Sequence, residues 1–172
     1  MEQQNLWLDT FENPTSSRLG NSWQAFTDRV MGGKSTMRAW HESTAGQSCL
    51  RITGEVRLEN RGGFIEVALP LVTRGHPFDA SHLQGLRLRV RGRQAPFQVH
   101  LRTSDHVRPW EHHRAQAFAA LDWHQVDIPF DQFEPRMTAA PLNLRKLVRL
   151  GLVCAGQAGP AQLDVAAVGL YG

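Results

Sequence analysis

Apolar and polar side chains alternate along much of the chain, which is the pattern of β-strands with one buried and one exposed face. Over residues 86–91 leucine or valine alternates with arginine, and over residues 97–102 apolar residues alternate with glutamine, histidine and arginine. No segment shows a sustained helical period, so the pattern predicts an all-β fold. We predict further strands or short strand-like stretches at residues 6–11, 23–26, 36–40, 49–58, 64–69, 123–130, 148–154 and 162–171.

The two arginine-containing strands are predicted to pair as a hairpin through the turn at residues 92–96. Pairing Val90 with Phe97 and Leu88 with Val99 places the apolar residues on one face. The opposite face then carries the basic side chains Arg87, Arg89, Arg91, His100 and Arg102. Guanidinium groups this close repel one another. We therefore expect carboxylates on adjoining strands, a bound anion or an acidic partner surface to neutralise them, and Asp127 is the first candidate.

Two glycine pairs are predicted to form tight turns, because glycine adopts positive φ and allows close backbone approach: Gly32 with Gly33, and Gly62 with Gly63. Asp28 and Ser35 flank the first pair, and their side chains can hydrogen-bond backbone groups that the turn leaves unpaired. The G-G-K-S sequence is not a phosphate-binding loop. Asp28 stands where that motif needs its first glycine, and residues 36–40 are predicted to be a strand rather than a helix. We expect the loop from Asp28 through Met31 to Ser35 to shape one rim of a binding surface.

Length and composition fit a single globular domain spanning residues 1–172. The chain is 41% hydrophobic and 20% charged, with a net charge of +3, and no window approaches the roughly 18 apolar residues of a membrane span. We expect no membrane insertion. The first residues lack the features of a signal or transit peptide, which predicts a cytoplasmic protein. Cys49 and Cys154 lie in apolar strand patterns, so buried thiols are expected rather than a disulfide or a zinc site.

Candidate catalytic and metal-binding chemistry is sparse. Glu111, His112 and His113 are consecutive, and neighbours on an extended segment point to opposite sides, so they cannot all face one metal ion. No serine or cysteine stands at a recognisable spacing from a histidine and an acid, and no two carboxylates are spaced for glycoside hydrolysis. We predict a protein that is not an enzyme and that binds neither metal nor cofactor.

Four ordered blocks, spread over nearly the whole chain, resemble the complex I intermediate-associated protein 30 family. They are W-x4-D-x-V-M-G-G-x-S at residues 23–35, N-R-G-G-F at 60–64, G-L-R-L-R-V-R-G at 85–92 and W-H-Q-V-D-I-P-F-D-Q-F-E-P at 123–135. The resemblance implies a galactose-binding-like jelly roll, a β-sandwich of two antiparallel sheets, in a stand-alone bacterial member. It also implies a role in assembling respiratory NADH:ubiquinone oxidoreductase, the role of the mitochondrial members, and it supplies no established catalytic residues.

Candidate binding residues lie in the loop at residues 105–114 and on the arginine face. Trp110 is a loop aromatic expected to be exposed, Arg114 follows closely, and His113 stands where the family segment leads us to expect an aromatic residue. We predict a protein partner with acidic residues, such as an assembly intermediate, that contacts Trp110, His113, Arg114, Arg87, Arg89 and Arg102. A carbohydrate stacked on Trp110 is one alternative, and an outer face that is only solvated or salt-bridged is another. Nucleic acid is disfavoured because the arginines lack interleaved aromatic residues.

Overall fold

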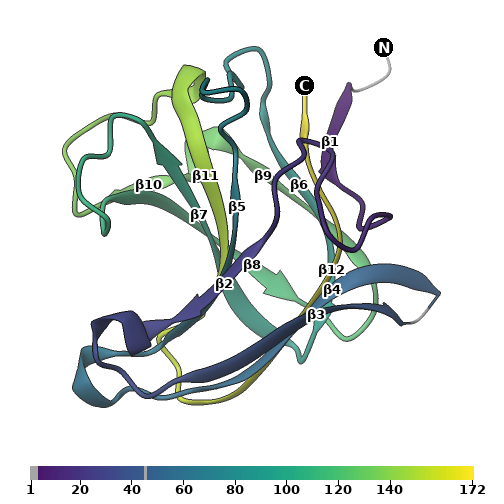
Figure 1. Cartoon of the computed structure of the whole chain (residues 1–172), viewed down its shortest axis with the longest axis vertical. Helices are drawn as coiled ribbons and strands as arrows, with labels where there is room; N and C mark the ends of the chain where they lie inside the picture. The colour runs from purple at the N-terminus through teal and green to yellow at the C-terminus, as the bar shows by residue number, and fades with distance from the viewer. Residues whose placement is uncertain (1–3, 45) are drawn as a thin grey trace.

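Two antiparallel β-sheets pack face to face in the computed structural model, which describes residues 4–44 and 46–172 (Figure 1). Sheet A has the order β3 (Thr36–Thr44), β4 (Gln47–Val56), β12 (Gly159–Tyr171), β6 (Gly85–Gly92) and β9 (His124–Pro129), with β1 (Asn5–Asp9) also paired to β12. Sheet B has the order β10 (Glu134–Arg136), β8 (His112–Ala119), β7 (Ala95–Thr103), β11 (Leu147–Ala155), β5 (Phe64–Pro70) and β2 (Gln24–Thr27).

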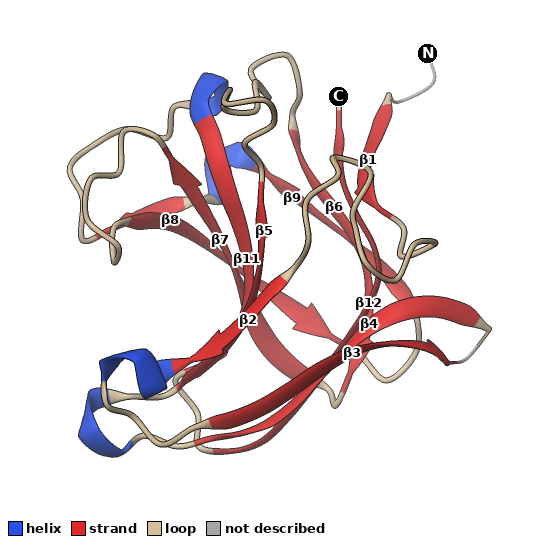
Figure 2. Cartoon of the chain, in the orientation of Figure 1, coloured by secondary structure: helices blue, strands red, loops and turns tan. Residues whose placement is uncertain are grey.

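The connections between strands carry short 3₁₀ helices, drawn as the blue segments of Figure 2. They are η1 (Asp28–Met31), η2 (Glu59–Arg61), η3 (Phe130–Gln132) and η4 (Leu144–Lys146). The predicted all-β sandwich of two antiparallel sheets is confirmed. Within the described residues, no helix has the length and apolar character that crossing a membrane would require.

The core lies between the sheets and is filled by the apolar members of the alternating strands. Leu88 and Val90 of β6 and Val165 of β12 enter it from sheet A, while Val99 of β7 and Leu152 of β11 enter it from sheet B. All of these side chains are buried, and burying one such side chain stabilises the fold by roughly 1.5–3 kcal/mol. Alternation therefore identifies the inward positions of these strands correctly.

The predicted hairpin between residues 86–91 and 97–102 is wrong, because the two segments lie in different sheets. β6 pairs with β12 and β9 in sheet A, whereas β7 pairs with β11 and β8 in sheet B. The turn between β6 and β7 carries the chain across the sandwich, so both strands point their apolar residues into the same core from opposite sides. Their basic residues consequently lie on opposite outward faces of the molecule.

Strand β8 has no counterpart among the predicted strands. Its sequence, H-H-R-A-Q-A-F-A, is rich in alanine and lacks β-branched residues, so it has little strand preference of its own. Pairing with β7 on one side and β10 on the other supplies the backbone hydrogen bonds that hold it extended. Residues 112–114 therefore belong to a strand and not to the preceding loop.

A buried carboxylate ties together two of the connections between the sheets. The chain passes from β2 to β3 through η1 and returns from β4 to β5 through η2. Oδ1 of Asp28 accepts a hydrogen bond from the N–H of Ser35 at 3.0 Å, and Oδ2 accepts from the Ser35 hydroxyl at 2.5 Å and the N–H of Gly63 at 2.6 Å. The Ser35 hydroxyl in turn accepts from the N–H of Arg57 at 2.8 Å. The prediction that Asp28 and Ser35 bind turn backbone is confirmed.

The glycines of both turns are required by this carboxylate and by the backbone around it. A Cβ on Gly33 or Gly62 would overlap the carboxyl group of Asp28. Gly32 and Gly63 have φ angles of 87° and 118°, a region that other residues rarely adopt. Each pair thus contains one glycine that makes room for Asp28 and one that makes the turn.

We predict that Asp28→Asn lowers the free energy of unfolding by about 2–4 kcal/mol, because an amide cannot accept every hydrogen bond that this buried carboxylate accepts. Burial alone would raise the pKa of Asp28, but hydrogen bonds from Ser35, Gly63 and Phe64 outweigh burial and hold the pKa below its ordinary value of 3.8. The contribution is therefore complete above that pH and is lost as the pH falls through the folded pKa. Urea unfolding measures the change, with Asp122→Asn, at an exposed position, as the control. Equal unfolding midpoints for the two variants would contradict the prediction.

Candidate functional site

The outward face of sheet A carries arginines that the protein neutralises itself. Arg87 donates from Nε and Nη2 to the two carboxylate oxygens of Asp127, at 2.8 and 2.7 Å, so the predicted counter-charge is confirmed. Arg51 and Arg91 both donate from Nε to the buried carboxylate of Asp164, at 2.8 and 3.0 Å. Charge-assisted pairs of this kind are among the stronger hydrogen bonds in proteins. The face therefore has its own counter-ions for these guanidinium groups.

The candidates Arg87 and Arg89 lie on this outward face of sheet A, and their role as docking groups stays a prediction. Arg87 is buried, and its guanidinium also lies 5.0 Å from the ring centre of Tyr171. Arg89 donates to the side-chain oxygen of Gln47 at 2.9 Å. Arg102, the fourth arginine of the predicted cluster, lies on the outward face of sheet B. The cluster is thus divided between two opposite surfaces.

Three candidates belong to the predicted rim loop. Asp28 and Ser35 have buried side chains, and Met31 has an exposed one. Asp28 and Ser35 are completely buried, so their side chains can act on a binding surface only through the shape of the loop. Met31 and its neighbour Val30 are 59% and 71% exposed. These apolar side chains belong to η1, which directly follows β2 at the edge of sheet B.

The β7–β8 loop and the start of β8 place two further candidates. Trp110 is 53% exposed, with the guanidinium of Arg108 5.8 Å from its ring centre. His113 is buried, which corrects its expected role as a contact residue. Nδ1 of His106 accepts from the N–H of Thr103 at 2.8 Å and so carries no proton. Neutral His106 therefore donates from Nε2 to Nδ1 of His113 at 3.0 Å, and the pair closes the base of the loop.

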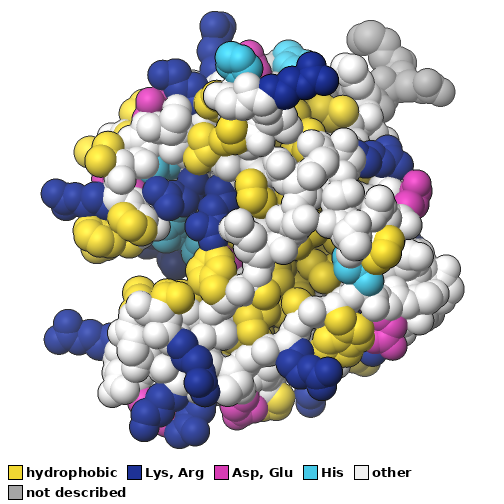
Figure 3. Space-filling view, viewed as in Figure 1, with side chains coloured by type: hydrophobic (Ala, Val, Ile, Leu, Met, Phe, Trp, Pro, Cys, Tyr) yellow, Lys and Arg dark blue, Asp and Glu magenta, His cyan; other side chains and the backbone are white. Residues whose placement is uncertain are grey.

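Strand register gathers basic side chains on the outward face of sheet B. Arg149 of β11 lies directly opposite Arg102 of β7, and His100 of β7 lies opposite Arg114 of β8. We call the surface lined by Glu66, His100, Arg102, His112, Arg114 and Arg149 the basic face. Figure 3 shows the molecule hollowed between the lobe formed by the β7–β8 loop and the lobe formed by η1 and η2, with Lys, Arg and His side chains gathered in the hollow.

Small residues leave room at the centre of the basic face. Ala68 of β5 and Gly151 of β11 are paired neighbours, and both are buried. Because Gly151 has no side chain, the carboxyl group of Glu66 lies over the backbone there, where a Cβ would overlap it. Glu66 is 9% exposed, and its Oε1 lies 3.9 Å from Nη2 of Arg149. This is a long ion pair and not a hydrogen bond.

The three arginines of the basic face have few partners. Arg149 covers the ring of Phe26, with its guanidinium 4.7 Å from the ring centre, and forms the long ion pair with Glu66. Arg102 donates from Nη2 to backbone carbonyls of the β7–β8 loop, at 3.0 and 3.4 Å. Arg114 makes no side-chain hydrogen bond or ion pair with any residue that the structure describes.

Buried nitrogen atoms without partners cluster on the same face. In the described part of the chain these atoms are Nε of Arg102, Nε of Arg149 and Nε2 of His112, together with Nε1 of Trp123, which directly precedes β9 of sheet A and lies away from the basic face. Buried polar atoms are almost always hydrogen-bonded, so these atoms mark bonding capacity that the folded chain does not use. Burial lowers the pKa of Arg102, and repulsion from Arg149 lowers it further. An anion on the basic face would supply both acceptors and counter-charge.

Two uncharged imidazoles lie among the arginines. His100 and His112 stack with ring centres 4.0 Å apart and an interplanar angle of 20°. Burial, with smaller contributions from the positive charges of His112, Arg114 and Arg149, lowers the pKa of His100 to about 3. Burial also lowers the pKa of His112. Both rings are therefore neutral at neutral pH, and the arginines carry the positive charge.

Glu66 is the group of the basic face that titrates nearest to neutral pH. Burial raises its pKa to about 7, while Arg149 and Arg102 favour the ionised form and oppose the rise. Near neutral pH, the guanidinium groups of Arg149 and Arg102 therefore share one carboxyl group that is only partly ionised. A strongly shifted acid beside specific charges is typical of functional sites.

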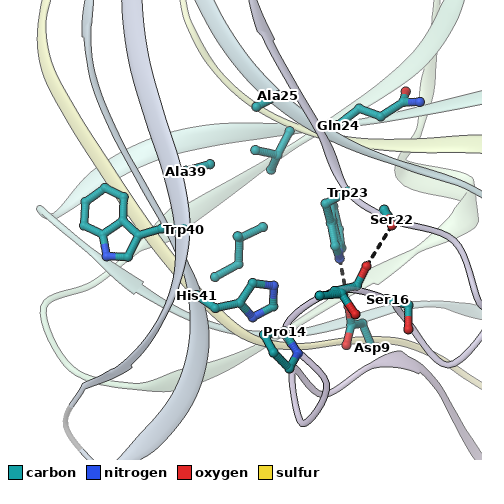
Figure 4. A pocket seen from close by; sticks show the side chains of 13 residues that line it. Asp9, Pro14, Ser16, Ser22, Trp23, Gln24, Ala25, Ala39, Trp40 and His41 are labelled. Carbon is teal, nitrogen blue, oxygen red and sulfur yellow. Dashed lines mark hydrogen bonds between the residues drawn. The ribbon is translucent and has the colours of Figure 1, made fainter.

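Two cavities lie away from the basic face. One of about 170 Å³ opens beside β2 and β3 and is lined by Trp23, Asp9 and His41 among others (Figure 4). Trp23 donates from Nε1 to Oδ2 of Asp9 at 2.8 Å, and Oδ1 accepts from the N–H of Phe11 at 2.7 Å, so both oxygens are engaged. The other, of about 370 Å³, adjoins the β6–β7 turn and has Arg93 as its charged lining residue. Neither cavity assembles several titratable groups, and no three metal-ligating side chains of the described residues are grouped to hold an ion.

Sequence analysis identifies Arg102 and Arg114 but misses Glu66 and Arg149. Glu66 stands between the inward residues of the segment 64–69, so the alternation already marks it as an outward-facing acid. Arg149 likewise precedes the buried Leu150. The missing information is the order of strands, because only the position of β11 between β5 and β7 brings these two side chains together with Arg102.

The fold defines a jelly-roll β-sandwich whose charged groups lie on an open sheet face instead of in a deep pocket. A model of the Complex I intermediate-associated protein 30 (CIA30) family matches residues 10–165. The chain therefore belongs to this family, as its four sequence blocks indicate. A comparison with curated proteins finds no match.

Solved structures with a similar fold include bacterial carbohydrate-binding modules. The family 11 module of the cellulosomal cellulase Lic26A-Cel5E of Clostridium thermocellum has a TM-score of 0.73 and 14% identity, over 99% of this chain and 95% of that one. A family 11 module from the same organism, in complex with a β-1,3-1,4-mixed-linked tetrasaccharide, gives 0.70 and 14% over 98% and 94%. The family 30 module of its cellulase Cel9D-Cel44B gives 0.65 and 13% over 99% and 97%. Likeness at this identity establishes the jelly-roll fold alone.

We predict that Glu66→Gln stabilises the protein near pH 8 by about 1–3 kcal/mol and has little effect near pH 4.5. The folded pKa of about 7 lies above the ordinary value of 4.5, so the folded protein keeps a proton that the unfolded chain has released. Stability therefore falls as the pH rises through this window, and glutamine removes the loss. Urea unfolding at both pH values measures it, with the exposed Glu55→Gln as the control. The same change at both pH values would show that Glu66 does not titrate in this window.

Proposed function

We propose that this chain is a non-catalytic binding domain that holds a protein partner on its basic face, the partner being an assembly intermediate of respiratory complex I. The observation that carries the proposal is the set of half-buried arginines on that face, of which only Arg149 forms an ion pair with a described residue, the long one with Glu66 at 3.9 Å. Membership of the CIA30 family supports the identity of the partner, because the family's description names a complex I intermediate. Exposed Trp110 and Met31 supply apolar contacts from the two lobes beside the hollow.

The arrangement of titratable groups on the basic face supports binding rather than catalysis. His100 stacks on His112 and has its Nε2 2.9 Å from the side-chain oxygen of Gln98, so it is not aligned with a nucleophile. Glu66 lies against Arg149 and the backbone of Gly151 instead of facing a second carboxylate across a cleft. These groups can order a ligand by charge and hydrogen bonding, but they lack the pairings that acyl transfer or glycoside hydrolysis needs.

Deleting the gene in the source organism should lower the amount of assembled complex I and its NADH:ubiquinone activity, and the wild-type chain should restore both. Arg114→Glu should fail to restore them, because it places a carboxylate among the groups that receive the partner. Arg38→Glu, the same change at an exposed position on sheet A, should restore them fully. Thermal melts of the purified variants check that both are folded. Normal complex I in the deletion strain, or full rescue by Arg114→Glu, would contradict the proposal.

A carbohydrate is the second candidate ligand, favoured by the likeness in fold to a module solved with a tetrasaccharide. Trp110 and Phe118 are about half exposed and could stack on a sugar ring. Guanidinium groups already lie over several aromatic rings, and Trp110 itself has that of Arg108 5.8 Å from its ring centre. Arg149 lies over Phe26, Arg38 over Trp40 and Arg91 over Trp123, at 4.7, 5.3 and 5.6 Å from the ring centres.

We predict that isothermal titration calorimetry detects no binding of the β-1,3-1,4-mixed-linked tetrasaccharide at roughly millimolar concentrations. The reason is that covered rings leave few platforms for stacking, and a neutral sugar does not answer the charge of the basic face. Binding that Trp110→Ala abolishes and the exposed substitution Val107→Ala does not would establish a carbohydrate site and reject this prediction.

A further inference from the structure

The arginines on the two outward faces of the sandwich differ in how far carboxylates of the chain neutralise them. On sheet A, the buried carboxylate of Asp164 accepts hydrogen bonds from both Arg51 and Arg91. Among the six residues that define the basic face, the one ion pair is that of Glu66 with Arg149, at 3.9 Å. One chain therefore supplies buried counter-ions to one sheet and leaves the arginines of the other largely without them.

The charged groups of the basic face are held in positions that disfavour their charge in the free protein. Arg149 and Arg102 lie opposite each other on adjacent antiparallel strands, where like charges repel. Their Nε atoms are buried and have no acceptor among the described residues. Burial lowers the pKa of Arg114 and Arg136 adds repulsion in the same direction, while Glu134, which lies opposite Arg114 on β10, partly offsets both. Each of these penalties is removed by an anion that reaches the guanidinium groups.

The spacing of the arginines fits an extended chain laid across the strands. β11 and β8 are separated by β7, and neighbouring strands lie about 4.8 Å apart, so the positions of Arg149 and Arg114 are about 10 Å apart across the sheet. Same-side residues of an extended peptide recur every ~6.6 Å, and the length of a Glu or Asp side chain adds reach. Alternate acidic residues can therefore meet successive guanidinium groups, each of which accommodates a carboxylate in a fork geometry.

Other anions fit these observations less well. A single phosphate or carboxylate ion would answer one or two guanidinium groups and leave the rest unpaired. An acidic oligosaccharide has the length, but it would also use ring faces for stacking, and guanidinium groups lie over the rings of both Phe26 and Trp110. Charge complementarity over several spaced arginines favours an acidic peptide.

We infer that the basic face receives an extended acidic segment of a partner protein, with Asp or Glu side chains at alternate positions paired to Arg102, Arg114 and Arg149. The inference rests on the proposed function and names the chemistry by which the partner is recognised.

The test uses the full chain and a fluorescein-labelled peptide of alternating glutamate and serine, about ten residues long, with the matching glutamine–serine peptide as the neutral probe. Fluorescence anisotropy should show binding of the acidic peptide alone, and binding should weaken as salt rises. Arg114→Glu should weaken it at least about tenfold, and Arg114→Gln by less, because charge reversal adds repulsion to lost attraction. Arg38→Glu, the matched change on sheet A, should leave binding unchanged.

Several outcomes would overturn the inference: no binding of the acidic peptide, equal binding of both peptides, or binding that survives Arg114→Glu in a folded protein. Binding of an oligogalacturonate but not of the peptide would replace it with an acidic sugar. Failure of the inference about the acidic segment is distinguishable from failure of the proposed assembly function. Genetic rescue that Arg114→Glu abolishes, without peptide binding, would leave the assembly role and reject the acidic segment. Peptide binding with normal complex I in the deletion strain would reject the assembly role instead.

Discussion

The buried carboxylate of Asp28 is the interaction on which the arrangement of the two sheets depends. Connections that leave one sheet and enter the other contain backbone N–H groups without ladder partners. Asp28 accepts from the N–H groups of Ser35 and Gly63, so one side chain satisfies both the β2–β3 and the β4–β5 connection. A buried ion is costly unless it is fully hydrogen-bonded, and here it is. The same contacts fix the lobe of η1 and η2, which forms one wall of the hollow beside the basic face.

Once the sheets are stacked, their outward faces are free to differ, because neither packs against another layer. On sheet A, Arg87 pairs with Asp127, and Arg51 and Arg91 pair with Asp164. On sheet B, the small residues Ala68 and Gly151 lie at the centre of the basic face, where no large side chain fills the hollow between the arginines. Such a surface is identified as a candidate binding site by its unmatched charges more than by the depth of a pocket. The two cavities have volume but few charged groups, whereas the basic face has charge without a deep pocket.

Alternation predicts the inward residues well, since a residue's face is fixed by its own strand. It cannot say whether two such strands pair in one sheet or face each other across the core, and Val90 and Phe97 satisfy both arrangements. Strand β8 is missed because its alanines carry little β-propensity and its neighbours hold it extended. The basic face cannot be predicted from local sequence patterns for a related reason. Glu66 and Arg149 are far apart in sequence, and they meet only because β11 lies between β5 and β7.

Glu66 links the charge of the basic face to its protonation. In the free domain it is the internal acid nearest to Arg149, and burial raises its pKa to about 7, so both of its protonation states are accessible near neutral pH. A carboxylate that arrives at the same guanidinium repels the ionised form of Glu66 and raises that pKa further. Binding of the proposed acidic segment would therefore be coupled to uptake of a proton. Linkage is reciprocal: a ligand that favours neutral Glu66 binds more tightly when Glu66 is neutral. Glu66 can in this way reduce the positive charge of the empty face and become neutral when a better-placed anion replaces it.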